Sequence, residues 1–454
     1  MARTVAELPN GARITDFISL GVISKTFPLI MIEKVLSRTG KASQRQRELP
    51  AHVVVYYVIA LALYMQASCR EVLRCLLEGL QWLKEPGVKI HVTGKSGISQ
   101  ARSRLGWEPI ETLHDEIVKP MAKRETKGAW YRTWRLVSLD GSTMDTADTQ
   151  ENRESYGRPG ARRGKSAFPQ LRFVSLVENG THVLFGTRMG PYSMGETTLG
   201  KGVLPNLTPG MLCLADLNFL CFELWEQARA TGADLLWRGK KNLALPCLKC
   251  FADGSYLSVM YPSQRDRRTK TNGVTVRVIE YTLEGVSGTE PFYRLLTTIL
   301  DYEKAQAHEL AALSHERWEI ETALDELKTH LRGSRIVLRS KTPALVKQEF
   351  YGLLLAHYAI RGLMHEAALK GDTDPDTLSF IHTVRVVRRK LPRFISISPQ
   401  ERNVFHEAVL DEIPEERVMS SRGRRNYRGV KRKMSNYPIR PRSRPVQDRV
   451  NIKL

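Results

Sequence analysis

The chain has 454 residues, 42% hydrophobic and 26% charged, values that are ordinary for a globular protein of two to four domains. Its charge balance is unusual, because 69 Lys and Arg residues against 48 Asp and Glu residues give a net charge of +21. Such a field concentrates polyanions, so nucleic acid is the first partner to consider and an anionic membrane surface is the alternative. Six scattered cysteines argue against a disulfide-built scaffold.

No segment has the pattern of an export signal or a membrane span. The opening MARTVAELPN lacks an apolar run behind its charge. Residues 53–65 are apolar, but this stretch is too short to cross a bilayer and suits a buried helix. Cys247 and Cys250 form the one close cysteine pair, and no second pair or histidine follows at zinc-site spacing. We therefore expect a cytoplasmic protein with reduced thiols, no membrane partner and no zinc site.

The first part of the chain is predicted to be helical. Helical patterns fill residues 14–84, and residues 96–117 give two more helices joined near Gly106. Arg102 and Arg104, exposed on such helices, could form a DNA-reading element. A small bundle with solvated arginines is an equally good interpretation. We expect an all-α N-terminal domain over residues 1–125 that binds DNA.

From Trp134 onward the pattern changes to short strands. The first strand is followed by two that flank Asn179-Gly180, a strong hairpin signal. Strands and helices then alternate, which is the order of a ribonuclease-H-like (retroviral-integrase-like) sheet. We therefore expect an α/β catalytic core over residues 130–370. The predicted strands cover residues 136–139, 171–177, 182–187, 211–215 and 233–237.

Two segments depart from this alternation. Residues 240–300 are alternating and glycine-punctuated, and they predict an inserted β subdomain. The last 37 residues, 418–454, contain 12 Lys or Arg and one acid, with no apolar period. We expect the C-terminal basic segment, residues 371–454, to be largely disordered after about 418 and to lie on DNA phosphates. A solubilising tail is the alternative.

Three acidic residues stand where phosphoryl-transfer chemistry would require them. Asp140 and Asp216 follow predicted strands, and Glu321 lies on a predicted helix. Arg317 and Lys328 are four residues before and seven residues after Glu321, so all three side chains share one sector of the helix. A solvated salt bridge is the alternative for the helical residues alone. The two aspartates upstream favour an active site.

These residue types suit a pair of magnesium ions, with Mn²⁺ as a possible substitute. Magnesium prefers carboxylate oxygens, and two such ions can activate a nucleophile and stabilise the leaving oxygen of a phosphodiester. Asp140 would bridge both ions, while Asp216 and Glu321 would each complete one. Arg317 and Lys328 would then bind phosphate oxygens. Glu319 and Glu326 point away from this sector, so they are expected to be solvated. A loop with Arg162, Arg163 and Lys165 is predicted to contact the DNA backbone.

The chain resembles bacterial insertion-sequence transposases of the DDE class, in the insertion-sequence-four family. The family signature Tyr-x2-Arg-x3-Glu-x6-Lys is matched by Arg317, Glu321 and Lys328, with Ser314 at the tyrosine position. LDGSTMDTADTQENRESYG is similar to the first-aspartate block. LADLNFLCFELWEQARATGADLLWR is similar to the second, although Leu217 and Asn218 replace a common Arg-Gly. The resemblance covers nearly the full chain.

This resemblance implies cut-and-paste DNA transposition. The enzyme would bind the terminal inverted repeats of its element, nick the DNA, form and open a hairpin, and join the end to target DNA. Arg317 and Lys328 would hold the terminal phosphate, and a homodimer would pair two ends in a synaptic complex. Two alternatives stay open from the residues: a catalytically inactive DNA-binding protein derived from a transposase, and a structure-specific nuclease.

Overall fold

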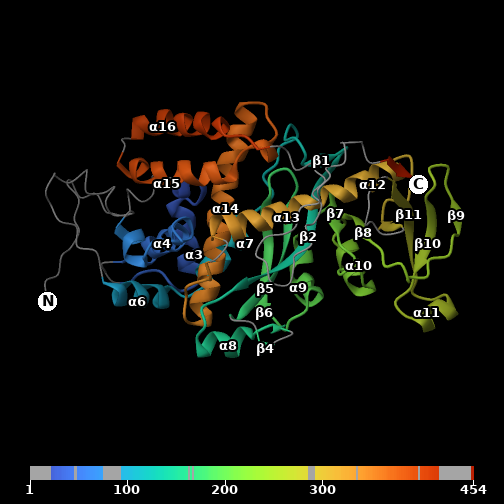
Figure 1. The fold of residues 1–454 in the computed structure, drawn as a ribbon, viewed down its shortest axis with the longest axis horizontal. Helices are drawn as coiled ribbons and strands as arrows, with labels where there is room; N and C mark the ends of the chain where they lie inside the picture. Colours follow the sequence, from blue (N-terminus) through green and yellow to red (C-terminus); the bar gives the residue numbers. More distant parts are fainter. Residues whose placement is uncertain are drawn as a thin grey trace, which may run out of the picture.

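The computed structural model describes residues 22–44, 49–74, 94–161, 164–165, 168–284, 292–333, 336–396, 399–418 and 451–453. The molecule is elongated, with helices gathered at one end and a sheet that extends to the other (Figure 1). The predicted basic tail lies outside the described residues, apart from its last strand, β13 (Asn451–Lys453).

One mixed sheet of 11 strands forms the centre of the molecule, in the order β6-β5-β2-β7-β8-β12-β11-β10-β9 with β1 and β13 attached. β2 pairs with β7, and β7 with β8, in parallel; the other pairs are antiparallel. The predicted hairpin at Asn179-Gly180 is confirmed as β5–β6, with Gly180 at a φ of 78° that favours glycine. The strands are β1 (Trp130–Tyr131), β2 (Trp134–Asp145), β5 (Gln170–Glu178), β6 (Val183–Pro191), β7 (Met211–Ala215), β8 (Asp234–Arg238), β9 (Lys249–Cys250), β10 (Tyr256–Met260), β11 (Val274–Glu284) and β12 (Tyr293–Thr297).

The segment predicted as a β insertion does form strands, and these strands continue the central sheet. β12 pairs with β8, placing Leu296 opposite the buried Trp237. β11, β10 and β9 follow outward from β12, and β13 pairs with the end of β11. The hydrogen bonding is therefore unbroken from β6 to β9.

The N-terminal helices pack on α14 (Pro343–Lys370), a long helix that is buried on most of its surface. α4 (Ala51–Leu63) is buried along nearly its whole length, as expected for its apolar sequence. A Cβ atom on Gly352 of α14 would lie 2.8 Å from Val58 Cγ1 of α4, so glycine permits the close crossing of the two helices. No helix in the described ranges is long and apolar enough to span a bilayer. The other helices here are α2 (Val22–Thr26), α3 (Leu29–Arg38), α6 (Lys95–Leu105), α7 (Glu108–Ile117), α15 (Phe380–Ser396) and α16 (Pro399–Glu412).

Arg102 of α6 is not on the surface as predicted. Its side chain is buried and donates to Gln348 Oε1 at 2.8 Å and to Ser340 Oγ at 3.1 Å. The prediction from α6 alone was wrong because α14, some 240 residues later, covers this face. Arg102 therefore joins the N-terminal helices to the rest of the protein.

The helices that border the sheet complete the fold. α13 lies against β2, and α9 lies against β5 and β6. The chain enters α13 through a break at Arg317, which caps both α12 and α13. These helices are α8 (Gln150–Tyr156), α9 (Glu196–Val203), α10 (Phe222–Arg229), α11 (Gln264–Thr269), α12 (Ala307–Glu316), α13 (Trp318–Asp325) and the π-helical turn η3 (Glu326–Leu331).

Candidate active site

Asp140 and Asp216 come together where two parallel strands stop pairing. β2 and β7 pair up to Leu139 and Ala215, and the two aspartates follow directly. β7 ends there as predicted, whereas β2 continues to Asp145 paired with β5. The prediction that Asp140 follows a strand end is therefore wrong, because the β5 hairpin supports the rest of β2. The sheet still brings both aspartates to the same point.

The Asp140 carboxylate is mostly buried, with 23% of the side chain exposed. Its Oδ1 accepts from the Gly141 amide at 2.7 Å, and its Oδ2 lies 3.5 Å from Nη1 of Arg317. Burial raises the pKa of Asp140 to about 6, and the negative charges of Glu196 and Asp216 add to this effect. Arg317 and the Gly141 amide act in the opposite direction but do not cancel it. Burial is therefore the main reason that Asp140 resists ionisation, and the neighbouring carboxylates make a smaller contribution.

Asp216 faces a cation that the sequence analysis missed. Nη1 of Arg238, the last residue of β8, lies 3.7 Å from Asp216 Oδ1. This oxygen is buried and has no hydrogen-bond partner. Because β7 and β8 are parallel neighbours, a cation ending the next strand was the signal that could have identified Arg238.

Arg317 and Lys328 bracket Glu321 over β2. Arg317 approaches Asp140, and Lys328 Nζ donates to Ser142 Oγ at 2.8 Å. Asp140 and Ser142 are two residues apart, so they lie on one face of β2, and α13 covers that face. Glu321 lies on α13 between the two cations and is exposed. The structure thus places Asp140 and Asp216 at the end of the β2–β7 pairing, brings Arg317 and Lys328 to β2, and leaves Glu321 on the helix that covers this face.

The helix that carries these residues is not uniform. α13 gives way at Glu326 to a π-helical turn that contains Lys328. The prediction assumed a regular α-helix, in which a spacing of seven residues aligns Lys328 with Glu321. The wider π turn sets Lys328 back relative to that alignment, and burial lowers its pKa.

The carboxylates are suited to a hard divalent cation but do not form a complete cage. Within the described residues, no three His, Cys, Asp or Glu side chains converge as a preformed metal site. Magnesium retains several waters and commonly binds through one or two carboxylates plus substrate phosphates. The unpartnered Asp216 oxygen and the raised pKa of Asp140 fit such an open, acidic site.

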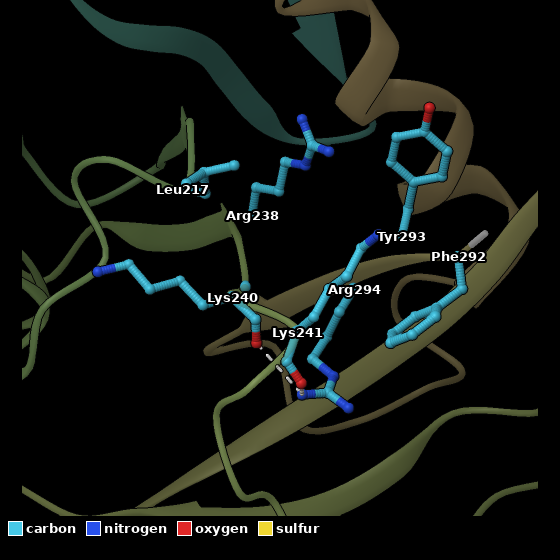
Figure 2. A pocket seen from close by; sticks show the side chains of 8 residues that line it. Leu217, Arg238, Lys240, Lys241, Phe292, Tyr293 and Arg294 are labelled. Carbon is cyan, nitrogen blue, oxygen red and sulfur yellow. Dashed lines mark hydrogen bonds between the residues drawn. The ribbon is translucent and has the colours of Figure 1, made fainter. Parts of the chain in front are cut away.

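A basic and aromatic pocket adjoins Asp216 (Figure 2). The Arg238 guanidinium lies 5.0 Å from the centre of the Tyr293 ring, and Lys241 lies 5.6 Å from that of Phe292. Cations bind phosphate and aromatic faces stack on bases, so this pocket is chemically suited to a nucleotide. Its lining residues are Leu217, Arg238, Gly239, Lys240, Lys241, Phe292, Tyr293 and Arg294.

A tyrosine from the sheet reaches Ser314, where the family signature has tyrosine. The Tyr281 hydroxyl lies 3.0 Å from Ser314 Oγ and 3.2 Å from Nε2 of His315. Tyr281 stacks on Tyr293, with ring centres 5.3 Å apart. The side chain comes from β11, so no motif on the helix could have predicted it.

The predicted basic loop is described only in part. Arg162 and Arg163 lie outside the described residues, and only the backbone of Lys165 is described, in the short strand β4 (Gly164–Lys165), which pairs with β3 (Gly160–Ala161). Their contact with DNA stays a prediction.

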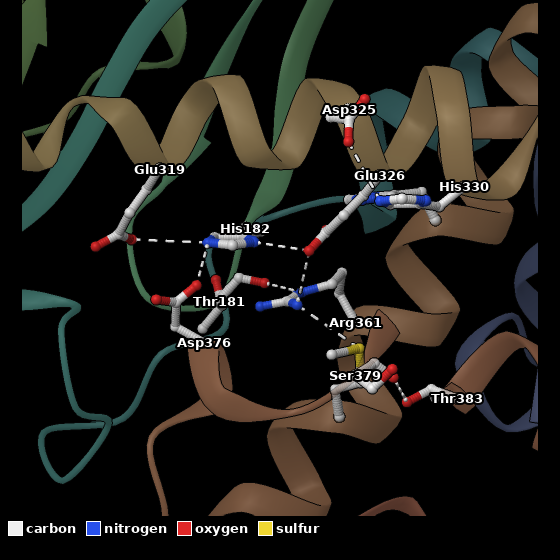
Figure 3. A network of polar contacts seen from close by, with 12 residues as sticks. Thr181, His182, Glu319, Asp325, Glu326, His330, Arg361, Asp376, Ser379 and Thr383 are labelled. Carbon is white, nitrogen blue, oxygen red and sulfur yellow. Dashed lines mark hydrogen bonds and ion pairs between the residues drawn. The ribbon is translucent and has the colours of Figure 1, made fainter. Parts of the chain in front are cut away.

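The opposite side of α13 carries a second acidic cluster, in which Glu319, Glu326 and Asp376 are buried around His182 (Figure 3). Glu319 and Glu326 are 2% and 5% exposed, so the prediction that they are solvated is wrong. The β5–β6 turn and α14 cover this side of the helix, which the helix sequence alone does not reveal. Glu319 Oε2 accepts from the Gly180 amide at 2.6 Å.

Glu326 is the centre of this buried cluster. Its Oε1 lies 3.0 Å from His182 Nδ1 and 3.3 Å from Arg361 Nη1, and its Oε2 lies 3.2 Å from His357 Nε2. These partners hold the pKa of Glu326 well below its usual range, although burial acts in the opposite direction. Arg361 also donates from Nε to the Thr181 carbonyl at 2.6 Å. The cluster therefore ties α13 and the turn that follows it to α14 and to the β5–β6 turn.

Comparisons with known proteins show similarity to transposases. The family model Insertion element 4 transposase N-terminal matches residues 17–115, and Transposase DDE domain matches residues 134–359. The chain is 27% identical over 424 residues to Transposase InsG for insertion sequence element IS4 of Escherichia coli (strain K12), covering 91% of this chain and 92% of InsG. It is also similar to the piggyBac transposase in a solved synaptic complex with hairpin DNA, with a TM-score of 0.41, 10% identity and coverage of 91% and 87% of the two chains.

Proposed function

Because the chain belongs to the IS4 family of DDE transposases, we propose that it moves an insertion sequence by a metal-dependent cut-and-paste route. The observation that carries this proposal is the meeting of Asp140 and Asp216 beside the helix of Glu321. The catalytic domain would be residues 130–370 with a ribonuclease-H-like core, formed by β6-β5-β2-β7-β8. The helical residues 1–125 would bind the terminal inverted repeats.

Asp140, Asp216 and Glu321 are the residues that would hold divalent ions, Mg²⁺ or Mn²⁺. Such ions supply charge that activates a water or a 3′-hydroxyl and stabilises the leaving oxygen. Asp140 must lose its proton to serve as a ligand, and its raised pKa means that it does so near neutral pH. The open arrangement leaves room for the DNA phosphate.

The reaction would proceed in balanced phosphoryl transfers. Water attacks the phosphorus at the end of the element, and the broken P–O bond leaves a 3′-hydroxyl. That hydroxyl attacks the opposite strand to form a hairpin and releases the flanking DNA. A second water opens the hairpin, and the regenerated 3′-hydroxyl attacks target DNA.

The protein's own cations would hold the DNA during these steps. Arg317 and Lys328 lie on either side of Glu321, where they can bind phosphate oxygens next to the scissile bond. The pocket of Arg238 and Tyr293 beside Asp216 offers a second phosphate and base contact. A homodimer would pair the two ends of the element in a synaptic complex.

A cleavage assay tests this proposal. The full chain is incubated with Mg²⁺ and a duplex that carries the inverted repeats flanking its gene, in parallel with Asp140→Asn and Glu321→Gln. We expect hairpinned and joined products from the wild type, a loss of cleavage of about three orders of magnitude or more in both variants, and DNA binding within a few fold. Nicks without joining indicate a nuclease, and a shifted band without cleavage indicates an inactive DNA-binding protein. Cleavage that persists in both variants removes these residues from the active site.

A further inference from the structure

Two cysteine side chains lie next to each other at the outer end of the sheet. The Sγ atoms of Cys247 and Cys250 are 2.9 Å apart, and both thiols are free. A small rotation of either side chain would bring the two sulfurs to bonding distance. Cys250 is the last residue of β9, the strand that ends the sheet. The fold therefore holds these two thiols as a pair.

Packing does not explain either side chain. Free cysteine is among the most buried residue types, because its thiol behaves as a small apolar group. Cys213, in the middle of β7, is of this kind and is fully buried. In contrast, Cys247 and Cys250 are both exposed, as are all residues from 246 to 250. The pair is thus open to small molecules in solution and fills no core.

Strand pairing fixes the backbone on which the two thiols stand. The Leu248 amide donates to the Leu257 carbonyl at 2.8 Å, and Cys250 lies opposite Tyr256 of β10. The four residues 247–250 are therefore already held against the neighbouring strand. A bond between the two sulfurs would require no rearrangement of the chain.

The segment just before the pair borders the pocket beside Asp216. Residues 239–246 connect β8 to Cys247, and the first three of them line that pocket (Figure 2). Nη1 of Arg294, on the other side of the pocket, donates to the Leu243 carbonyl at 2.8 Å. Only three residues separate Leu243 from Cys247. A covalent link at Cys247 would therefore fasten the outer end of this pocket segment.

We propose that Cys247 and Cys250 are a reversible modification site, at which a low-molecular-weight disulfide oxidises the two thiols to a protein disulfide that fastens the pocket segment. Exposed disulfides belong to the labile class, so small thiols would reduce the bond again. The inference goes beyond the proposed function and does not depend on it, because it requires neither metal nor DNA.

The oxidation would proceed by two thiol–disulfide exchanges. One cysteine thiolate attacks a sulfur of the small disulfide, forms a mixed disulfide and releases one small thiol. The second cysteine thiolate attacks the protein sulfur of the mixed disulfide, forms the bond between Cys247 and Cys250 and releases a second small thiol. The two protons of the cysteine thiols end on the two released thiols. The protein pair loses two electrons, and the small disulfide gains them.

Oxidation of the full chain by mixtures of reduced and oxidised glutathione tests the inference. The products are identified by intact mass and by peptide mapping. The wild type should form the link between Cys247 and Cys250 and lose it when reduced glutathione is added in excess. Cys247→Ser and Cys250→Ser should instead retain one glutathione at the cysteine that remains. Because closure of the pair is intramolecular, the wild type should carry at least about tenfold less of this mixed disulfide than either variant.

Cys221→Ser is the matched control. Cys221 is also exposed, and its thiol has no second thiol beside it within the described ranges. This variant should therefore oxidise at the pair as the wild type does. Stable glutathione adducts on both Cys247 and Cys250 of the wild type would overturn the inference. So would a tightly bound Zn²⁺ ion that both thiols hold and that prevents their oxidation.

Hydrogen exchange tests whether the bond fastens the pocket segment. Amide exchange over residues 239–246 should slow severalfold in the oxidised wild type and return to its original rate on reduction. Cys247→Ser, which cannot close the pair, should show no change under the same oxidation. Equal exchange in the oxidised and reduced wild type would overturn the proposed effect on this segment.

Discussion

The two sides of α13 place carboxylates in opposite electrostatic environments. On the side facing α14, Glu326 is buried among Arg361, His182 and His357, and its pKa is held well below the usual range. On the side facing β2, Asp140 is less buried, yet burial raises its pKa to about 6. Glu326 thus has cationic partners that outweigh its burial, whereas Arg317 and the Gly141 amide only partly offset the burial of Asp140.

This difference separates a structural role from a chemical one. A buried carboxylate whose partners are all present stabilises one arrangement of the chain, and removal of one partner leaves an uncompensated charge. A carboxylate group with too few cations is unfavourable until a ligand arrives. The same helix therefore depends on one cluster for its position, while the other is the site that we propose binds metal and DNA.

The largest expected effect is on stability, from the buried side. Arg361→Met should destabilise the protein by about 3–5 kcal/mol, because Glu326 loses its full cation in a buried site. Arg317→Met, the matched change on the β2 side, should leave stability nearly unchanged and impair cleavage instead. Urea unfolding and the cleavage assay on both variants check this. Equal destabilisation by the two changes would contradict the comparison.

Protonation of Glu326 and of Asp140 should change the stability of the protein in opposite directions. The lowered pKa of Glu326 gives stability that is present above the usual glutamate pKa of 4.5 and is lost as pH falls below it. The raised pKa of Asp140 has the reverse effect, so its contribution to stability is lost as pH rises from about 3.8 to about 6.

Variants separate the contributions of Glu326 and Asp140 to stability when the free energy of unfolding is measured between pH 3 and pH 8. Glu326→Gln should flatten the acid limb of the stability profile. Asp140→Asn should flatten the limb between about pH 4 and 6. The same profile from both variants would mean that the assignment of charge to the two sides is wrong.

Mg²⁺ should stabilise the protein more at pH 7 than at pH 5. Near pH 5 Asp140 is mainly protonated in the metal-free protein, and a metal must displace that proton to bind. At a free Mg²⁺ concentration tenfold above Kd the gain at pH 7 is about 1.4 kcal/mol. Thermal melts with and without Mg²⁺ at the two pH values measure it, and Asp140→Asn should abolish the difference.

The smallest expected effect is a gain in stability. Without metal at pH 7, Asp140→Asn should stabilise the protein by about 1 kcal/mol, because it removes a charge that burial disfavours and part of the shift is screened by solvent. Glu326→Gln should not stabilise the protein under the same conditions. A destabilised Asp140→Asn protein would show that the site at β2 is compensated after all.

Local patterns predicted the strands and the elements that carry Asp140, Asp216 and Glu321. Apolar runs, a hairpin signal and helical spacing act over a few residues, and these features are read directly from the chain. The predictions that were wrong concerned residues whose surroundings depend on contacts between distant segments. Arg102 and Glu326 look solvated on their own helices, and distant segments, chiefly α14, bury them. Arg238 and Tyr281 were missed because each comes from an element separate from the signature helix.

Strands β9 to β12, which lie between β8 and α12 in the sequence, also limit how the protein can be shortened. β8 is a buried apolar strand, and β12 satisfies the backbone groups along its outer side. A deletion of residues 240–300 would turn β8 into an exposed hydrophobic edge, which is a template for aggregation. The segment that looks most dispensable in the sequence thus keeps the strand beside Asp216 from joining a neighbouring molecule, and its loss should be visible first as insolubility.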